Sequence, residues 1–474
     1  MRDRTMRCLI LLWFFGIIGC NKFADVNTPD SQIEASKIYQ DNKTAMMSLY
    51  NIYGGMFDKN ASPAKIARFT GLCSDELELA WESNTQGFYW NKISSGSIYL
   101  DSLWSTCYLY IRNANDVFWG CAASEKLDSV VKKQLMGEAL FIRAYWFFYL
   151  TGLFGDIALP ITTDAKVNAL LSRTSQSKVY QQIVSDLQTA AIDLGDNYVG
   201  SDSKSLSTER NRPNRAVVSA LLARVYLYMG KYEEAEEQAN AIIAMDEVYE
   251  LVPLDQVFLK NSKEAIWQLS PGTPNVSSIN TTEGNEFIIT QPPKYRIQQA
   301  ISPYLLRAFD VGDQRRKHWI NSYTDRSVSP AVTYYYPYKY KVNFGDDLKE
   351  YSMILRLAEI YLIRAECEVY LGHLSAALTD LNKIRQRAGL AAFTEGVLDA
   401  KGLIKAILKE RQTELFTEQG HRWFDLKRTG TIAAVMSTVT PAKGGDPWNT
   451  TRELWPIPIS ELRRAPNLVQ NPGY

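Results

Sequence analysis

The residues that most suggest chemistry are carboxylates near the C-terminal end of the chain. Glu410, Glu414 and Glu418 recur every four residues, which places them on one face of a helix predicted over 402–428. A glycosidase needs two carboxyl groups roughly 5–9 Å apart on opposite sides of a bond. Side chains that project in one direction from one helix do not flank a substrate. We therefore interpret them as members of an ion-pair network with nearby basic residues, namely Arg411, Arg422, Lys427 and Arg428.

Other signatures of catalysis are missing from the sequence. The three histidines, His318, His373 and His421, match no metal-binding spacing, and no Gly-x-Ser-x-Gly elbow or phosphate-binding loop occurs. Four cysteines follow residue 20 without a Cys-x-x-Cys pair, so we expect no zinc site and expect mostly buried free thiols. The sequence thus predicts a protein without catalytic residues, metal or cofactor.

An aromatic segment at 81–90 does not have the spacing of a core helix. Trp81, Tyr89 and Trp90 stand there among Ser, Asn and Gly residues, with Asn84 between them. Rings on a buried helix face would recur every three to four residues. This segment therefore favours a loop that exposes some of its rings.

Helical hairpins are predicted to hold such loops in place. In 351–387, apolar residues recur at helical spacing up to Gly372, and a second amphipathic helix begins at Leu374. Glycine accepts the left-handed conformation that ends a helix. The motif Gly-x-(Tyr/Leu)-x-x-Ala between two helices is the tetratricopeptide pattern. It occurs twice, in Gly230, Tyr232 and Ala235 and again in Gly372, Leu374 and Ala377.

The chain changes character between these two hairpins. Residues 252–350 are rich in Pro, Gly, Asn, Ser and Tyr, with short β-like runs at 264–269, 287–290 and 334–341. The sequence therefore predicts a mostly α fold. Its parts are an N-terminal tetratricopeptide-like helical-hairpin region (33–251), an inserted irregular subdomain of loops and short strands (252–350), and a C-terminal helical region with an extended tail (351–474).

The first residues read as a secretory signal. Arg2, Arg4 and Arg7 precede a short apolar run, too short for a permanent transmembrane helix. The end of this run, Ile-Ile-Gly-Cys at 17–20, resembles a bacterial lipobox. We expect a signal peptide at 1–19, a lipid on Cys20 and a polar tether at 20–32. The alternative is an ordinary signal peptide with an incidental cysteine.

Composition argues against two classes of partner. The chain has 474 residues, with 52 basic and 52 acidic side chains. A net charge of zero disfavours nucleic acid, which needs a basic surface. It also disfavours a polybasic membrane patch. We expect membrane attachment to depend on the lipid at Cys20.

The motifs, in their order, resemble those of the SusD/RagB family of outer-membrane nutrient-binding lipoproteins of Bacteroidetes. Each motif is weak alone, but the order is specific to that family. The matching segments are 17–20, 143–156, 220–235, 309–315, 356–366, 381–385, 410–415, 422–428, 455–458 and 470–474.

The resemblance implies a tetratricopeptide-like scaffold that sits as a lid on a SusC-like TonB-dependent β-barrel transporter. It implies an outer-membrane protein that faces the outside and binds an oligosaccharide or polysaccharide, or less often a peptide. One feature departs from the family. Acidic residues often follow the lipidated cysteine, whereas here Asn21, Lys22, Phe23 and Ala24 precede the first acid, Asp25.

Sugars are bound by flat aromatic faces, with amides, carboxylates or arginine bonded to the hydroxyls. Stacking contributes roughly 1 kcal/mol per ring, by analogy with aromatic pairs, so several rings are needed. The segment 81–90 lies where the family's early binding loop falls, and the insertion offers a second group. For each residue the alternative role is packing. The candidates are Trp81, Asn84, Tyr89 and Trp90, and then Tyr295, Arg296, Trp319 and Tyr323.

Three alternatives to a glycan-binding lipoprotein stay open at this point. The first is a peptide-binding member of the same family. The second is a secreted glycoside hydrolase, and the third is a tetratricopeptide protein that only bridges other proteins. Release of reducing ends from a polysaccharide would favour the hydrolase.

Overall fold

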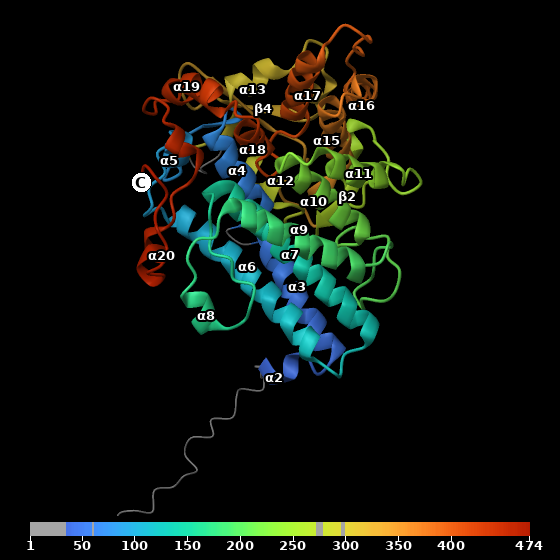
Figure 1. The fold of residues 1–474 in the computed structure, drawn as a ribbon. Helices are drawn as coiled ribbons and strands as arrows, with labels where there is room; N and C mark the ends of the chain where they lie inside the picture. Colours follow the sequence, from blue (N-terminus) through green and yellow to red (C-terminus); the bar gives the residue numbers. More distant parts are fainter. Residues whose placement is uncertain (1–34, 59–60, 272–277, 295–298) are drawn as a thin grey trace, which may run out of the picture.

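The computed structural model describes residues 35–58, 61–271, 278–294 and 299–474 (Figure 1). The predicted signal peptide, Cys20 and the tether lie outside this part, as do Tyr295 and Arg296. Helices dominate the described residues, and the predicted mostly α, tetratricopeptide-like fold is confirmed. The division at residues 251 and 350 stays a prediction.

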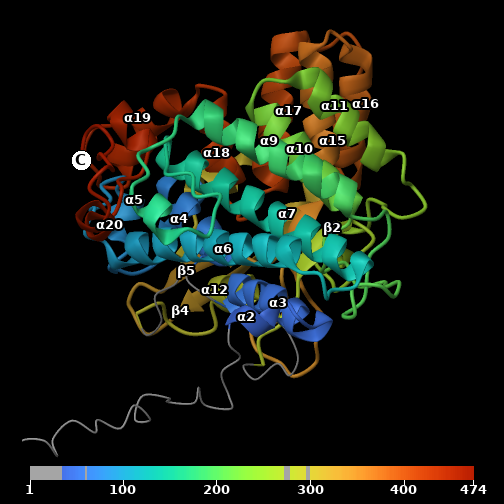
Figure 2. The ribbon, with the colours of Figure 1, turned by 60° about the horizontal axis from the view of Figure 1, so that its bottom comes forward.

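The N-terminal region is built from helices of very different lengths. The two longest, α6 and α7, cross the middle of the molecule, with α9 and α10 on one side and α3 on the other (Figure 2). The helices are α2 (Ala35–Ile38), α3 (Asn42–Asp58), α4 (Pro63–Cys73), α5 (Gln86–Tyr89), α6 (Ile98–Ala123), α7 (Ser129–Phe154), α8 (Ala165–Ala169), α9 (Gln176–Asp193), α10 (Arg215–Tyr228) and α11 (Tyr232–Ile243).

Helix α7 is the centre of the main core. Asp128 caps its start by accepting hydrogen bonds from the backbone N–H groups of Val130 and Val131. Its second half is apolar on nearly every side, and every residue from 137 to 151 is buried. Burying each large apolar side chain contributes about 1.5–3 kcal/mol. A helix of this kind must be surrounded by others, and α3, α6, α9 and α10 pack around it.

The two predicted hairpins pack against each other. Helix α10 is followed by α11, and α15 (Leu357–Tyr370) by α16 (Leu374–Arg387). Gly230 and Gly372 adopt φ of 70° and 85°, the left-handed conformation that the sequence predicts at both turns. Helix α11 lies against α15, which joins the hairpins into one array.

The segment 252–350 contributes most of the strands. The strands form three antiparallel pairs, β1 with β3, β2 with β6 and β4 with β5. The elements are β1 (Leu77–Leu79), a 3-10 turn (Leu254–Gln256), β2 (Ala265–Leu269), α12 (Thr282–Phe287), β3 (Gln299–Ile301), α13 (Pro303–Ala308), α14 (Gln314–His318), β4 (Ile320–Asp325), β5 (Val332–Pro337) and β6 (Ser352–Arg356).

The C-terminal region departs from the sequence prediction at one point. A single helix was expected over 402–428, but the structure has two helices separated by a turn in which Thr417, Gln419 and Gly420 have positive φ. The remaining elements are α17 (Ala400–Glu414), α18 (His421–Arg428), α19 (Ile432–Ala442), a 3-10 turn (Thr450–Glu453) and α20 (Ile459–Arg464). The tail then returns to the main core, where Trp455 packs against Phe88 and Phe154.

Within the described residues, no helix combines the length and apolar composition that crossing a membrane requires. The four cysteines there, Cys73, Cys107, Cys121 and Cys367, are buried free thiols, as the sequence predicts for most of them. In the same residues, no group of three His, Cys, Asp or Glu side chains is placed to hold a metal ion.

Candidate ligand-binding surface

Strand pairing brings the segment 81–90 beside the inserted region. Strand β1, which leads into 81–90, pairs with β3, so that Leu77 faces Ile301 and Leu79 faces Gln299. Strand β5 packs beside β3, and α13 follows β3 directly. We call the surface formed by β1, 81–90, β3, α13 and the β4–β5 hairpin the candidate surface.

The rings of 81–90 lie at this surface to different degrees. Trp81 is 50 % exposed, and Asn84 is also exposed. Tyr89 and Trp90 are half-buried, because 86–89 form the short helix α5 where the sequence predicted a loop. The indole N–H of Trp90 donates to the carbonyl of Lys443 at 3.0 Å, which fixes that ring against the loop after α19.

Two small cavities flank α5. Asn84 lines one of about 350 Å³, together with Lys92, Ser94 and Tyr99. Tyr89 lines the other, of about 280 Å³. Both are of a size that admits a single sugar ring or a small polar group, by comparison with ordinary ligand pockets of about 300–1,000 Å³.

The cavity beside Tyr89 combines rings with charges. Arg307 lies 5.0 Å from the ring centroid of Tyr304, and the Lys443 ammonium lies 5.0 Å from that of Tyr89. Glu78 forms part of the same lining. This set provides aromatic faces, a carboxylate and cationic donors within one concave area, which is the chemistry that hydroxyl-rich ligands need.

Burial shifts the titration of the groups around this cavity. It raises the pKa of Tyr89 to about 12 and the pKa of Glu78 above its usual value, and it lowers the pKa of Lys443 to about 8. The Lys443 ammonium nevertheless has partners, because it donates to the carbonyls of Leu72 and Ser74. Lys443 therefore holds the floor of the cavity in place.

The β4–β5 hairpin contributes tyrosines to the same surface. Tyr323 is half-buried and lies opposite Tyr334 in the strand register. Burial, followed by the charges of Asp325 and Glu78, raises the pKa of Tyr334. Its strand, β5, packs beside β3, the partner of β1. Tyr335 is 40 % exposed. The hairpin that carries Tyr323 thus packs beside β3, which pairs with the strand that leads into 81–90.

The prediction that Trp319 binds ligand is wrong. Its side chain is fully buried, and its indole N–H donates to the carbonyl of Leu254 at 3.0 Å. The ring packs against Phe258 and Phe416, with Lys339 over its face at 4.9 Å. The β-prone, polar neighbourhood in the sequence resembles a surface loop, but a second hydrophobic core lies beneath it.

Sequence reasoning did not single out four residues of the candidate surface: Glu78, Tyr304, Arg307 and Lys443. Tyr304 and Arg307 stand three residues apart on α13, and that spacing puts both on one face. Their pairing was therefore readable from the sequence. Lys443 lies more than 350 residues from Tyr89, and no local pattern connects the two.

The carboxylates of Glu410, Glu414 and Glu418 lie away from the candidate surface, in the interior. Glu410 and Glu414 are on α17, but Glu418 is in the turn after it, so the prediction of one shared helix face is wrong. All three are buried. Their partners also differ from those expected, because the sequence could not show which distant arginines would meet them.

Arg356 is the hub of this buried charge network. Its guanidinium contacts Glu264 at 2.8 Å, Glu414 at 2.6 Å and Glu418 at 2.7 Å. Arg315 bridges Glu410 at 2.6 Å and Glu414 at 2.9 Å. Burial alone would raise the pKa of Glu414, but the surrounding arginines outweigh it and hold the pKa well below its usual range.

The basic residues first assigned to these glutamates have other partners. Arg411 and Arg428 contact Asp425 at 2.8 Å each, and Arg422 contacts Asp75 at 2.8 Å. Lys427 donates to the carbonyl of Gly152 at 2.5 Å. An ion-pair network does exist at this end of the chain, as predicted, but its members pair with other residues than the sequence analysis assigned.

Comparison with known proteins agrees with the motifs and the fold. Residues 307–474 match the model of the SusD family, and residues 22–227 match a model described as "Starch-binding associating with outer membrane". The chain belongs to the SusD family.

Two SusD-like relatives come from Formosa agariphila. SusD-like protein P2 is 28 % identical, with 79 % of this chain and 81 % of the relative covered. SusD-like protein P25 is 24 % identical, with 97 % of both covered.

Solved SusD structures have the same fold. A SusD superfamily protein from Bacteroides vulgatus gives a TM-score of 0.77 at 18 % identity, covering 92 % of this chain and 100 % of that one. A laminarin-binding SusD-like protein gives 0.72 at 23 % identity, covering 91 % and 99 %. The surface glycan-binding protein A from Bacteroides fluxus gives 0.72 at 24 % identity, with the same coverage.

Proposed function

We propose that this protein is a surface-exposed outer-membrane lipoprotein that binds an oligosaccharide or polysaccharide and delivers it to a SusC-like TonB-dependent transporter. The lipid on Cys20 anchors it in the membrane. The outer-membrane description of one matching family model and the glycan-binding names of two similar structures support this assignment.

The observation that supports the proposal is the pairing of β1 with β3, which sets the segment 81–90 beside α13. Tyr89, Tyr304 and Arg307 line one cavity there, and Trp81, in the same segment as Tyr89, is half exposed. Several rings of modest individual effect, with a carboxylate and a cation between them, suit a chain of sugar rings.

We propose a binding protein without a catalytic step. Glu410, Glu414 and Glu418 are held by arginine and lysine partners in the interior, where a polysaccharide does not reach. A hydrolase would need two carboxyl groups facing each other across an accessible bond. The geometry of these three therefore favours binding over hydrolysis.

Affinity electrophoresis in gels that contain single polysaccharides tests the binding. We expect retardation by at least one polymer without release of reducing ends. The double variant Trp81→Ala/Tyr304→Ala should lose about tenfold or more in affinity, since each ring contributes roughly 1 kcal/mol. The control variant Trp119→Ala removes a ring that is also exposed, at 46 %, but lies on α6 outside the candidate surface. Unchanged retardation of the double variant would overturn the site, and released reducing ends would favour a hydrolase.

Membrane attachment and the transporter partner need separate tests. Cys20→Ser should move the protein from the membrane fraction to the soluble fraction and abolish labelling by a fatty acid. Purification of the lipidated protein from outer membranes should recover a large β-barrel. Normal fractionation of Cys20→Ser would contradict the anchor, and recovery of the protein alone would contradict a stable transporter complex. If a peptide binds and no polysaccharide retards the protein, the peptide-binding alternative is correct.

A further inference from the structure

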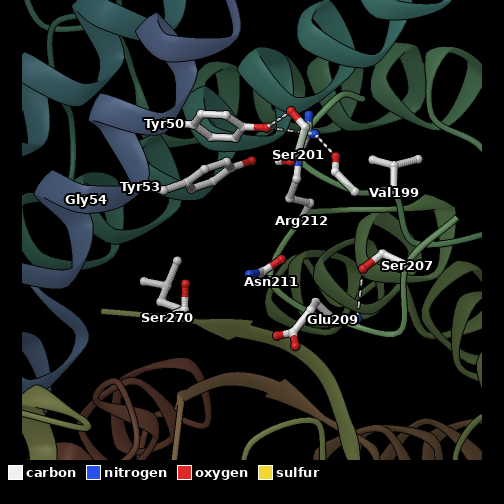
Figure 3. A pocket seen from close by; sticks show the side chains of 12 residues that line it. Tyr50, Tyr53, Gly54, Val199, Ser201, Ser207, Glu209, Asn211, Arg212 and Ser270 are labelled. Carbon is white, nitrogen blue, oxygen red and sulfur yellow. Dashed lines mark hydrogen bonds between the residues drawn. The ribbon is translucent and has the colours of Figure 1, made fainter. Parts of the chain in front are cut away.

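A cavity of about 510 Å³ lies apart from the candidate surface (Figure 3). It is enclosed by α3, by the segment that joins α9 to α10, and by the end of β2. None of these elements belongs to the candidate surface. Its lining includes Tyr50, Tyr53, Gly54, Glu209, Asn211 and Ser270.

Two tyrosines form one wall of the cavity, and the hydroxyl of each donates a hydrogen bond within the protein. Tyr50 and Tyr53 stand three residues apart on α3, so both project from the same side of the helix. The Tyr50 hydroxyl donates to the carbonyl of Ser201 at 2.5 Å, and the Tyr53 hydroxyl donates to Glu138 at 2.5 Å. These bonds fix the outer ends of the rings, which makes the wall rigid before any ligand arrives.

The full charges around the cavity are paired within the protein. Arg212 is buried, contacts the Glu138 carboxylate and donates to the carbonyl of Gly200 at 2.6 Å. Glu209 contacts Lys260 through Oε1 at 3.0 Å. Neither sign of charge is left in excess, so the cavity does not select for a strongly charged ligand.

One polar atom in the lining, Oε2 of Glu209, is buried without a partner among the described residues, although the side chain as a whole is 34 % exposed. Glu209 Oε2 accepts no hydrogen bond from the part of the chain that the structure describes. Figure 3 shows Glu209, Asn211 and Ser270 around the same open space, opposite the tyrosine wall. A buried acceptor of this kind is costly unless a donor reaches it. The cavity thus offers an unused carboxylate oxygen, an amide and a hydroxyl facing two rings.

We propose that this cavity is a second ligand site, which takes a neutral, hydroxyl-rich ring such as a mono- or disaccharide. The tyrosine rings would contact the C–H face of the ring, and Glu209 Oε2 would accept a hydrogen bond from one hydroxyl. Asn211 and Ser270 are placed to bond other hydroxyls. The proposal does not depend on the candidate surface, because the two sites share no lining residue.

Gly54 allows the cavity to be filled without disturbing the fold. It lies in α3 and lines the cavity, and a Cβ at this position meets no heavy atom within 4 Å. Gly54→Phe should therefore place a ring in the open space, while glycine is itself unfavourable inside a helix. Gly54→Ala is the matched control, since it adds one methyl group and leaves most of the cavity open.

The measurement is ligand-detected NMR on the full chain carrying Trp81→Ala/Tyr304→Ala, which weakens the candidate surface. The probes are glucose, galactose, mannose, xylose, maltose and cellobiose. We expect at least one probe to bind with saturation, Gly54→Ala to change its affinity less than twofold, and Gly54→Phe to lower it at least tenfold. Glu209→Gln should lower it about fivefold, because an amide replaces the stronger acceptor.

Three outcomes would overturn the proposal. The first is that no probe binds with saturation, which would leave the cavity to water. The second is equal affinity in Gly54→Phe and Gly54→Ala. The third is that glucosamine binds more than tenfold tighter than glucose, which would assign the cavity to amines. Circular dichroism of each variant checks the fold, and Glu209→Gln keeps the test decisive if Gly54→Phe does not fold.

Discussion

The network around Arg356 and the candidate surface use similar residue types in opposite ways. In the network, each carboxylate faces arginine or lysine partners and is buried from water. At the candidate surface, charges such as Glu78 and Arg307 stand beside rings that are partly exposed. The first arrangement fixes helices to one another, and the second leaves groups available to a ligand.

This difference shows why residue type alone misleads. Glu410 and Glu414 have the spacing of paired acids, yet both are occupied by Arg315. Trp319 stands in a polar, β-prone segment, yet its side chain is fully buried. Availability depends on which distant elements pack against a residue, so it becomes visible only in three dimensions.

The largest loss of stability should come from substitution of Arg356, the hub of the network. Arg356→Met leaves Glu264, Glu414 and Glu418 with fewer compensating charges in the interior. We expect the free energy of unfolding to fall by about 3–5 kcal/mol. Urea denaturation followed by circular dichroism measures this, and the exposed Arg316→Met should change stability by only about 0.5 kcal/mol or less. Similar losses in both variants would contradict the distinct role of the network.

Glu76 directly precedes β1 and accepts a hydrogen bond from the backbone N–H of Thr417 at 3.4 Å, beside Glu418 of the network. The protonation of Glu76 should respond to pH. Burial, followed by the charge of Asp75, raises its pKa to about 8. Between the usual pKa of a glutamate, about 4.3, and pH 8, the folded state keeps a proton that the unfolded state releases. The stability that this proton provides is complete below that usual value and is lost as the pH rises toward 8.

Glu76→Gln removes that dependence. Relative to the variant, we expect the wild type to lose about 1 kcal/mol of unfolding free energy per pH unit between pH 5 and pH 8, below the limit of about 1.4 for one proton. Urea denaturation at intervals of half a pH unit measures the difference. Parallel curves for the two proteins would show that Glu76 is charged in the folded state at neutral pH.

The smallest expected loss of stability is that of Trp319→Phe, which tests whether this ring packs in the core or binds ligand. Trp319→Phe leaves the carbonyl of Leu254 without its indole donor and opens a small gap in the second core. We expect a loss of about 1–3 kcal/mol in stability. Retardation by polysaccharide should be unchanged, measured by affinity electrophoresis at a temperature where the variant is folded. A loss of retardation in the folded variant would return Trp319 to the ligand-binding residues.

The repetitive part of the fold was largely readable from the sequence. Helix periodicity, with the glycines at 230 and 372, specifies both tetratricopeptide-like hairpins, and each glycine does adopt the predicted conformation. These features depend on neighbours within a few residues. Local physics therefore decides them, and one sequence is enough to recognise them.

The candidate surface was only partly readable from the sequence. The segment containing Trp81 was identified because its rings break helical spacing, but the contribution of Lys443 depends on a contact across more than 350 residues. The prediction for Trp319 is wrong because residues distant in the sequence, Phe258 and Phe416, cover its ring. The break in the predicted helix at 415–420 was also hidden, since only one of its three positive-φ residues is a glycine.

The pairing of β1 with β3 has a consequence for the order of folding. The two strands lie more than 200 residues apart along the chain and are three residues long each, so their hydrogen bonds offset little of the entropy of closing so large a loop. Helical hairpins such as α10–α11 join neighbouring residues and can form much sooner. We therefore expect the candidate surface to be the last part of the molecule to become native.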